Sequence, residues 1–150
     1  PVEFVGPPLV ELASPSESRR DFLCAHGLDP DAQTVALLPG SRPNELRAIF
    51  PELVRSVSEI VRHVPSTQFL IARAPNLDDA LLAPLGELSD TICQPVVVEG
   101  RTDDVLAASD VVVTASGTAT VQAAIHQRPM VIGLSTMVSD GVMPACMAAA

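Results

Sequence analysis

The stretch VVVTASGTATVQAAI, residues 111–125, joins an apolar run to a cluster of very small residues and then to a helix-compatible run. Three consecutive valines followed by Thr114 are typical of a buried strand. The small, hydroxyl-rich residues around Gly117 then mark the turn into a helix over 117–127. A buried strand that leads directly into a helix predicts part of a βαβ unit, and the rest of the chain repeats this order.

Short apolar runs alternate with helix-type patterns along the chain. The strands are nearly continuous in apolar residues, which is typical of a parallel sheet covered on both faces. With right-handed crossovers, the pattern predicts an α/β fold with a doubly wound parallel sheet. We expect Asn76 to cap a helix that Pro84 ends or kinks. The expected strands are 33–38, 67–72, 96–99, 110–114 and 129–133, and the expected helices are 43–62, 76–86, 103–109 and 117–127.

Two loops fall at the carboxyl ends of expected strands, where a doubly wound sheet binds its ligands. In LLPGSRPNE, residues 37–45, Gly40 permits close backbone approach, Ser41 offers a hydroxyl and Arg42 a bidentate phosphate contact. In TASGTAT, residues 114–120, small side chains leave the N–H groups of a helix start open to an anion. Taken singly, each loop is explained slightly better by ordinary capping and turn formation. Together, on neighbouring strands, they predict a diphosphate site.

The composition restricts the function classes. A chain of 150 residues that is 47% hydrophobic predicts one globular domain. Its net charge is −9 and every basic residue is an arginine, so we do not expect a nucleic-acid partner. No apolar run reaches the about 18 residues of a membrane span. The chain opens with Pro1 and shows no leader pattern, so we expect a piece of a longer protein.

The remaining reactive residues have ordinary explanations. The three cysteines fit neither a zinc nor a disulfide pattern and predict reduced thiols in a cytosolic protein: Cys24, Cys93 and Cys146. His26 and His126 fall late in expected helices, and His63 ends the long helix. No histidine has a metal-ligand spacing, so no metal site is expected. Asp103 and Asp104 are better explained as a helix start than as paired catalytic carboxylates. The long helix is expected to expose Arg47, Arg55 and Arg62.

Four segments, in order, resemble the C-terminal half of the lipid-A-disaccharide synthases: VEFVGPPL (2–9), LLPGSRPNEL (37–46), VVEGRTDDVLAASDVVVTASGTATVQA (97–123) and RPMVIGL (128–134). The resemblance covers residues 1–134 with gaps near 14–32 and 75–94, and LPGSR and SGTAT are its most specific parts. It implies the C-terminal, Rossmann-like domain of a GT-B glycosyltransferase, in which two such domains flank a cleft. It implies an interdomain linker over 1–14 and a nucleotide-sugar-binding domain over 15–134. Residues 135–150 match nothing in the family, and we expect an atypical, disordered tail.

The resemblance also implies an activity. Such enzymes transfer 2,3-diacylglucosamine from its UDP form to a lipid monosaccharide phosphate, lipid X. They form the β-1,6-linked lipid A disaccharide phosphate and release UDP, and neither a metal nor another cofactor is implied. The family acts in the cytoplasm at the inner face of the cytoplasmic membrane, although no basic or apolar patch in this sequence would anchor it. Because the acceptor-binding half with its expected carboxylate base is missing, this chain alone is expected to be inactive.

Residue by residue, the resemblance implies that Arg42 is catalytic, because it would stabilise the charge on departing UDP. Gln122 would bind the ribose. The backbone of Glu99, Gly100 and Arg101 would contact the uracil. The residues implied for the UDP phosphates are Gly40, Ser41, Arg42, Ser116, Gly117, Thr118, Ala119 and Thr120.

Three departures from the family pattern keep a second class open. Pro7 stands where the family has a histidine, Gln122 stands where it has a glutamate, and the family's basic and aromatic continuation is missing after Leu134. A non-catalytic nucleotide-binding or structural domain derived from a GT-B enzyme therefore remains an alternative. Related UDP-GlcNAc enzymes, such as the undecaprenyl-linked GlcNAc transferase and the UDP-GlcNAc 2-epimerase, share the fold and the phosphate-binding logic.

Overall fold

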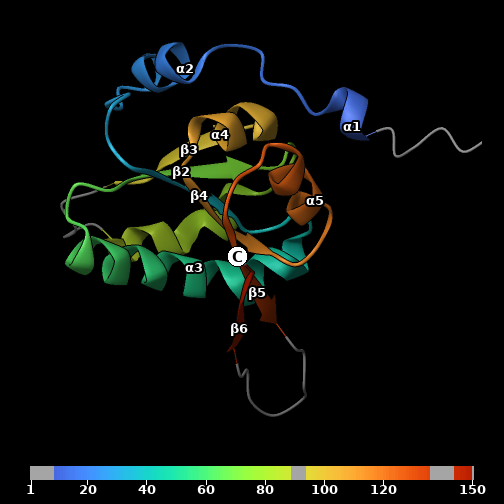
Figure 1. The fold of residues 1–150 in the computed structure, drawn as a ribbon. Coiled ribbons are helices and arrows are strands. Elements are labelled where there is room, and N and C mark those ends of the chain that lie inside the picture. Colours follow the sequence, from blue (N-terminus) through green and yellow to red (C-terminus); the bar gives the residue numbers. More distant parts are fainter. Residues whose placement is uncertain (1–8, 89–93, 136–143, 150) are drawn as a thin grey trace, which may run out of the picture.

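The computed structural model describes residues 9–88, 94–135 and 144–149. The chain alternates helices with strands, as Figure 1 shows. In order, the elements are α1 (Leu9–Leu12), α2 (Arg19–Ala25), β1 (Thr34–Leu38), α3 (Pro43–His63), β2 (Gln68–Arg73), the 3-10 helix η1 (Asp79–Leu88), β3 (Val96–Glu99), α4 (Thr102–Ala108), β4 (Val111–Ala115), α5 (Thr118–Ile125), β5 (Met130–Ser135) and β6 (Pro144–Ala149).

The strands form one sheet in the order β3-β2-β1-β4-β5-β6. The pairings from β3 to β5 are all parallel, which confirms the predicted parallel α/β sheet. The chain first builds the sheet outward from β1 through β2 to β3, and then returns to add β4 on the other side of β1. Leu38 at the end of β1 consequently pairs with Thr114 near the end of β4. This reversal of strand order brings the two predicted loops to the same edge of the sheet.

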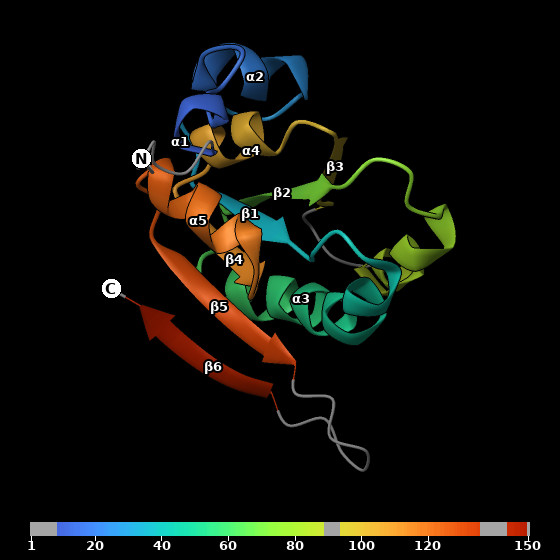
Figure 2. The ribbon, with the colours of Figure 1, turned by 90° about the vertical axis from the view of Figure 1, so that its right-hand side faces the viewer.

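Helices cover both faces of the sheet (Figures 1 and 2). Because side chains alternate along a strand, Leu37 faces one layer and Leu38 the other. Leu37 packs with Phe50 and Val54 of α3 and with Leu88 of η1. The opposite core, which contains Leu38, is filled from α2, α4 and α5 by Phe22, Leu23, Val105, Leu106, Ala108 and Ala123. Two separate cores therefore pack against the two faces of one sheet, and the strands between them carry the two loops at their carboxyl ends.

The segment expected to be an α-helix over 76–86 differs from the prediction. It forms the 3-10 helix η1, which begins at Asp79 and contains Pro84. Asn76 does not cap it, because Asn76 has a left-handed backbone with φ 65° and the Asp78 carboxylate accepts the Ala80 N–H at 2.9 Å. Pro84 has no N–H to donate, which weakens an α-helix at this point. A helix is thus present in this segment, in the 3-10 form, and the prediction that Asn76 caps it was wrong.

The two ends of the chain are described in part. Of the expected linker 1–14, Leu9–Leu12 form α1, and residues 1–8 lie outside the described residues. Of the expected disordered tail 135–150, Pro144–Ala149 form β6, which pairs antiparallel with β5. The sequence pattern predicted no strand there. Pairing with β6 supplies partners for the backbone groups that β5 would otherwise leave open at the sheet edge.

Candidate functional site

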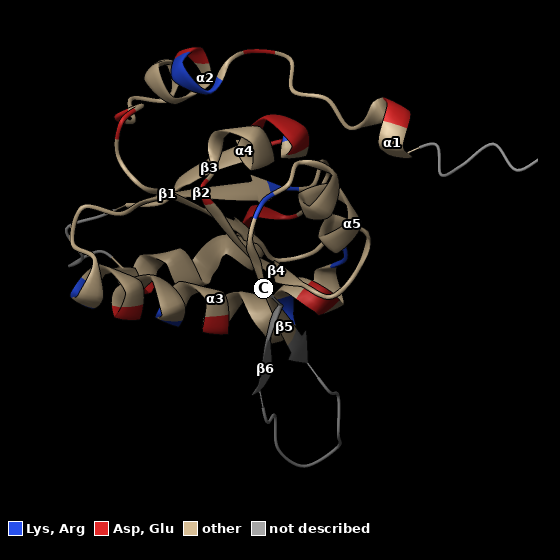
Figure 3. Cartoon of the chain, viewed as in Figure 1, with Lys and Arg blue, Asp and Glu red and all other residues tan. Residues whose placement is uncertain are grey.

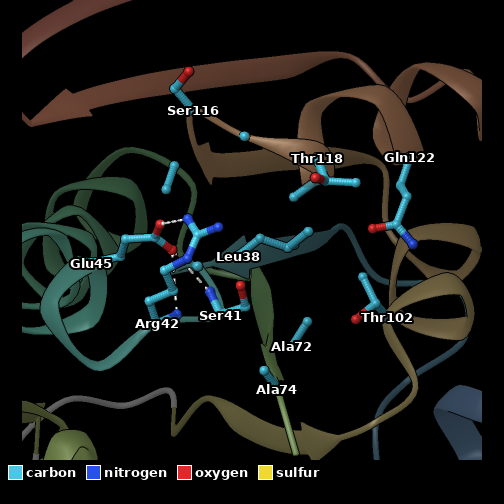
Figure 4. Close-up of a pocket in the computed structure, with 14 residues that line it drawn as sticks. Leu38, Ser41, Arg42, Glu45, Ala72, Ala74, Thr102, Ser116, Thr118 and Gln122 are labelled. Atoms are coloured by element: carbon cyan, nitrogen blue, oxygen red, sulfur yellow. Dashed lines mark hydrogen bonds and ion pairs between the residues drawn. The ribbon is translucent and has the colours of Figure 1, made fainter.

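A pocket of about 370 Å³ lies at the carboxyl ends of β1, β2 and β4, where the strand order reverses (Figure 4). This is the position at which open α/β sheets bind their ligands. Both predicted loops line it, together with residues from the end of β2 and the start of α4. The lining consists of Leu38, Gly40, Ser41, Arg42, Glu45, Ala72, Ala74, Thr102, Ala115, Ser116, Gly117, Thr118, Ala119 and Gln122.

The first wall of the pocket is the start of α3. Arg42 is the N-cap residue, and its Nη1 lies 2.6 Å from Oε1 of Glu45. Oε2 of the same carboxylate accepts the backbone N–H groups of Ser41 at 3.2 Å and of Arg42 at 3.3 Å. The Arg42 side chain, together with the Ser41 N–H, lowers the pKa of Glu45 against the opposing effect of burial. Glu45 is therefore an anion that the start of α3 already holds.

Gly40 is required at this wall for two reasons. Its φ is +107°, a backbone conformation that side chains disfavour. A Cβ at this position would also lie 2.7 Å from Oε2 of Glu45. Any larger residue would therefore displace the Glu45 carboxylate from the N–H groups that it accepts.

The second wall is the start of α5. The backbone at Gly117 is extended, and a Cβ built there would meet no heavy atom within 4 Å. The first N–H groups of any helix lack an intrahelical acceptor, and those of α5 begin at the pocket lining. Ser116 and Thr118 are exposed beside them. The combination of open space, N–H groups and hydroxyls suits an anion such as a phosphate.

Thr120 is the predicted phosphate residue that the structure does not bring to the pocket. Its hydroxyl donates to the Gly117 carbonyl at 2.7 Å, and its N–H bonds the same carbonyl at 3.1 Å. Thr120 therefore closes the first turn of α5 and does not belong to the lining. The remaining predicted phosphate residues all line the pocket: Gly40, Ser41, Arg42, Ser116, Gly117, Thr118 and Ala119.

Gln122, the predicted ribose residue, lines the pocket on the side of α4. Its Nε2 donates to Oδ1 of Asp103 at 3.5 Å, and Nε2 of His126 lies 2.9 Å from the same oxygen. In Figure 4 the amide oxygen of Gln122 lies on the side of the pocket interior and the amide nitrogen on the opposite side. Gln122 thus presents its amide oxygen to the pocket as a hydrogen-bond acceptor, whereas its amide nitrogen donates to Asp103.

The predicted uracil segment, Glu99, Gly100 and Arg101, does not line the pocket, whereas the next residue, Thr102, does. The Arg101 guanidinium faces the other way and lies over the Phe22 ring, with Cζ 5.0 Å from the ring centroid. There it bonds Glu17, Ser16 and Asp104. Glu99 pairs instead with Arg73, its Oε2 lying 3.4 Å from Nε.

Sequence reasoning missed three contributors to the pocket: Glu45, Thr102 and the end of β2 at Ala72 and Ala74. In the sequence, Glu45 is explained by its place in the first turn of the long helix, where the helix dipole favours an acid. The signal that could have found its contact is its position three residues after the N-cap, where a glutamate reaches back to the cap backbone. Ala72 and Ala74 carry no chemical signal, and only the adjacency of β2 to β1 brings them there.

The other predicted residues lie where the sequence placed them. His26 and His126 are C-cap residues of α2 and α5, and His63 ends α3. Asp103 and Asp104 stand in the first turn of α4. Cys24 is an exposed free thiol, and Cys93 lies outside the described residues. The three arginines of α3 are exposed, and two of them pair with glutamates one turn earlier: Arg47, Arg55 and Arg62.

The charged residues of the described part of the chain are dispersed rather than clustered. Within the described residues, no group of three or more His, Cys, Asp or Glu could hold a metal ion. Basic and acidic positions are interspersed over α2, α3 and the loops (Figure 3). None of the described helices combines the length and the apolar character that a membrane span requires.

Solved structures with the same fold include glycosyltransferases. A UDP-GlcNAc 2-epimerase from Neisseria meningitidis, solved bound to UDP-GlcNAc, aligns with a TM-score of 0.57 at 14% identity, over 76% of this chain and 30% of that one. A family 9 glycosyl transferase from Veillonella parvula aligns with a TM-score of 0.50 at 12% identity, over 85% and 35%. The sheet order and the place of the pocket thus define a Rossmann-like α/β domain of the kind that GT-B glycosyltransferases contain.

Comparison with known sequences identifies the family to which the chain belongs within this class of proteins. A family model described as lipid-A-disaccharide synthetase matches residues 1–139. The lipid-A-disaccharide synthase of Geobacter metallireducens is 40% identical over 132 residues, which cover 88% of this chain and 34% of the relative. That of Myxococcus xanthus is 38% identical over 129 residues, which cover 86% and 33%. The chain belongs to the lipid-A-disaccharide synthetase family, and it spans about a third of the length of these curated relatives.

Proposed function

We propose that this chain belongs to the donor-binding half of a lipid-A-disaccharide synthase and that its pocket holds the UDP part of UDP-2,3-diacylglucosamine. One observation carries the proposal. Two helix starts, those of α3 and α5, converge on one pocket at the point where the strand order reverses, and Arg42, the N-cap residue of α3, lines that pocket. Family membership supports the same substrate class.

In this proposal the diphosphate binds to the N–H groups at the start of α5 and to Arg42. Arg42 stabilises the negative charge that builds on UDP as the sugar leaves. The amide oxygen of Gln122 accepts from the ribose hydroxyls. The base lies toward Ala74 and Thr102, beside the predicted uracil segment.

The acceptor is lipid X, and it binds through the half of the enzyme that this chain does not contain. Transfer yields the β-1,6-linked disaccharide phosphate and UDP. Because the acceptor and the product are lipids, we propose that the enzyme works in the cytoplasm at the inner face of the cytoplasmic membrane. The missing half would also supply the carboxylate base.

The proposal is tested by calorimetric titration of UDP into the chain. We expect binding in the micromolar to millimolar range. Arg42→Ala should weaken it by about 10- to 100-fold, because hydrogen bonds to charged groups contribute about 1.5–3 kcal/mol. Arg62→Ala is the matched control, since Arg62 lies near the far end of α3 and makes the same kind of exposed ion pair.

Absence of UDP binding in a chain that circular dichroism shows to be folded would contradict the donor site. Equal losses in Arg42→Ala and Arg62→Ala would indicate a general charge effect rather than a site.

A non-catalytic nucleotide-binding domain is the second candidate. It is favoured by Gln122, which stands where the resembling family has a glutamate and which supplies a neutral acceptor in place of a charged one.

A further inference from the structure

Glu45 occupies the donors that make the start of α3 an anion site. Its two oxygens bond the Arg42 guanidinium at 2.6 Å and the backbone N–H groups of Ser41 and Arg42 at 3.2 and 3.3 Å. These are the groups that the sequence assigned to a phosphate. Gly40 makes this arrangement possible, because a Cβ there would fall 2.7 Å from the Glu45 oxygen. The carboxylate lies at the pocket lining, beside the space that a ligand would enter (Figure 4).

We propose that Glu45 is an internal counter-anion, which fills the anion site at the start of α3 and competes with the phosphates of a bound nucleotide for Arg42. This inference rests on the proposed function. In this inference the two walls of the pocket have different roles. The start of α5 offers N–H groups and open space to the ligand, whereas the start of α3 is already neutralised by the chain itself.

Two effects of Glu45 on a phosphate have opposite signs. A phosphate that accepts from Arg42 would lie within about 4–6 Å of the Glu45 carboxylate, since both accept from one guanidinium. At a dielectric between that of a protein surface and that of bulk water, which suits so exposed a pair, repulsion at this separation lowers affinity by about 5- to 100-fold. Holding the arginine in place gains less, because ordering one long side chain changes affinity by about 2- to 10-fold.

The comparison of these two ranges favours competition over positioning. The Arg42 side chain remains 78% exposed even when it is paired, so a ligand can reach the guanidinium. A nucleotide must share Arg42 with Glu45 or displace the carboxylate. When UDP departs, Glu45 can pair fully with Arg42 again. In this proposal the Glu45–Arg42 contact sets how tightly the protein binds UDP, although Glu45 does not contact the sugar that is transferred.

The test is calorimetric titration of UDP into wild type, Glu45→Gln and Glu59→Gln at low salt. Glutamine at position 45 keeps an acceptor for the two N–H groups and so preserves the helix start, but it removes the charge. Glu59→Gln is the matched control. It removes the same charge from the same helix, and its partner Arg62 lies 2.9 Å away, outside the pocket lining.

We expect Glu45→Gln to bind UDP about tenfold more tightly than wild type, and Glu59→Gln to match wild type. In an Arg42→Ala background, the gain from Glu45→Gln should shrink, because the contested guanidinium is gone. Weaker binding by Glu45→Gln would show that Glu45 positions Arg42, and would overturn the inference. Equal, measurable affinities of wild type and Glu45→Gln would overturn it while leaving the proposed function intact. UDP binding to neither protein would overturn both.

Discussion

At the scale of single residues, Gln122 is the residue that would contact the ribose in the proposed donor site. Its amide nitrogen is held by Asp103, and its oxygen lies on the side of the pocket interior. Gln122→Glu replaces that oxygen by a carboxylate, which accepts hydroxyl groups more strongly. The new charge would also lie near Asp103, and like charges at this separation repel.

We expect Gln122→Glu to tighten UDP binding several-fold, and Gln122→Glu combined with Asp103→Asn to tighten it further, since the second change removes the repulsion. Calorimetry with UDP and with 2′-deoxy-UDP measures this, because the gain should be smaller for the ligand that lacks one hydroxyl. A site without response to either variant would favour the non-catalytic alternative.

At the scale of elements, α4 fastens the segment that leads into α2. The Asp104 carboxylate, 7% exposed, accepts the Ser16 N–H at 2.6 Å and the Ser16 hydroxyl at 3.0 Å. It also pairs with Arg101 Nε at 2.9 Å, and Arg101 in turn bonds Glu17. Burial alone would raise the pKa of Asp104, but the Ser16 N–H and the Arg101 guanidinium outweigh burial and lower it.

An aspartate whose pKa is lowered on folding stabilises the fold above its unfolded pKa of about 3.9, and this contribution is lost as the pH falls through the folded value. Asp104→Asn should therefore lower the free energy of unfolding by about 1–3 kcal/mol at pH 7. The difference from wild type should shrink below about pH 4.

Urea unfolding at pH 7 and pH 3.5 measures both effects. Asp31→Asn is the control, because the Asp31 side chain is 83% exposed and pairs with Arg20 only at 3.6 Å. An Asp104→Asn protein as stable as wild type at pH 7 would contradict the role of this contact.

At the scale of the whole molecule, the pocket joins parts of the chain that meet only in the finished sheet. A ligand that contacts both the loop after β1 and the start of α5 should raise the melting temperature. At a UDP concentration of about 100 times Kd, mass action predicts about 2.7 kcal/mol, or a shift of about 5–10 °C for a domain of this size. Differential scanning calorimetry measures the shift, and Arg42→Ala should reduce it. Binding without any shift would mean that UDP also binds the unfolded chain.

The parts of this architecture that the sequence predicted correctly are local in origin. Apolar runs and their turns located the strands and both loops, because strand and turn preferences act over a few residues. The predictions that differ from the structure concern side chains for which a ligand and other groups of the chain compete as hydrogen-bond partners. The backbone of residues 99–101 was predicted to contact a uracil, but the segment does not line the pocket, and the Arg101 side chain bonds Glu17 and Ser16, more than eighty residues earlier in the chain. Thr120 offered its hydroxyl to a phosphate in the prediction, and in the structure it closes its own helix turn.

The pairing of Leu38 with Thr114 has a consequence for how the pocket comes into being. The residues between these two, among them β2 and β3, form a long loop that closes when β4 pairs with β1. Closing so long a loop lowers the chain entropy, and the walls of the pocket at α3 and α5 face each other only after the loop has closed. We therefore expect the pocket to form late during folding. A folding intermediate that contains only β1, β2 and β3 would lack the α5 wall of the pocket and could not bind a nucleotide there. The rate at which nucleotide binding appears during refolding would therefore report the rate at which β4 pairs with β1.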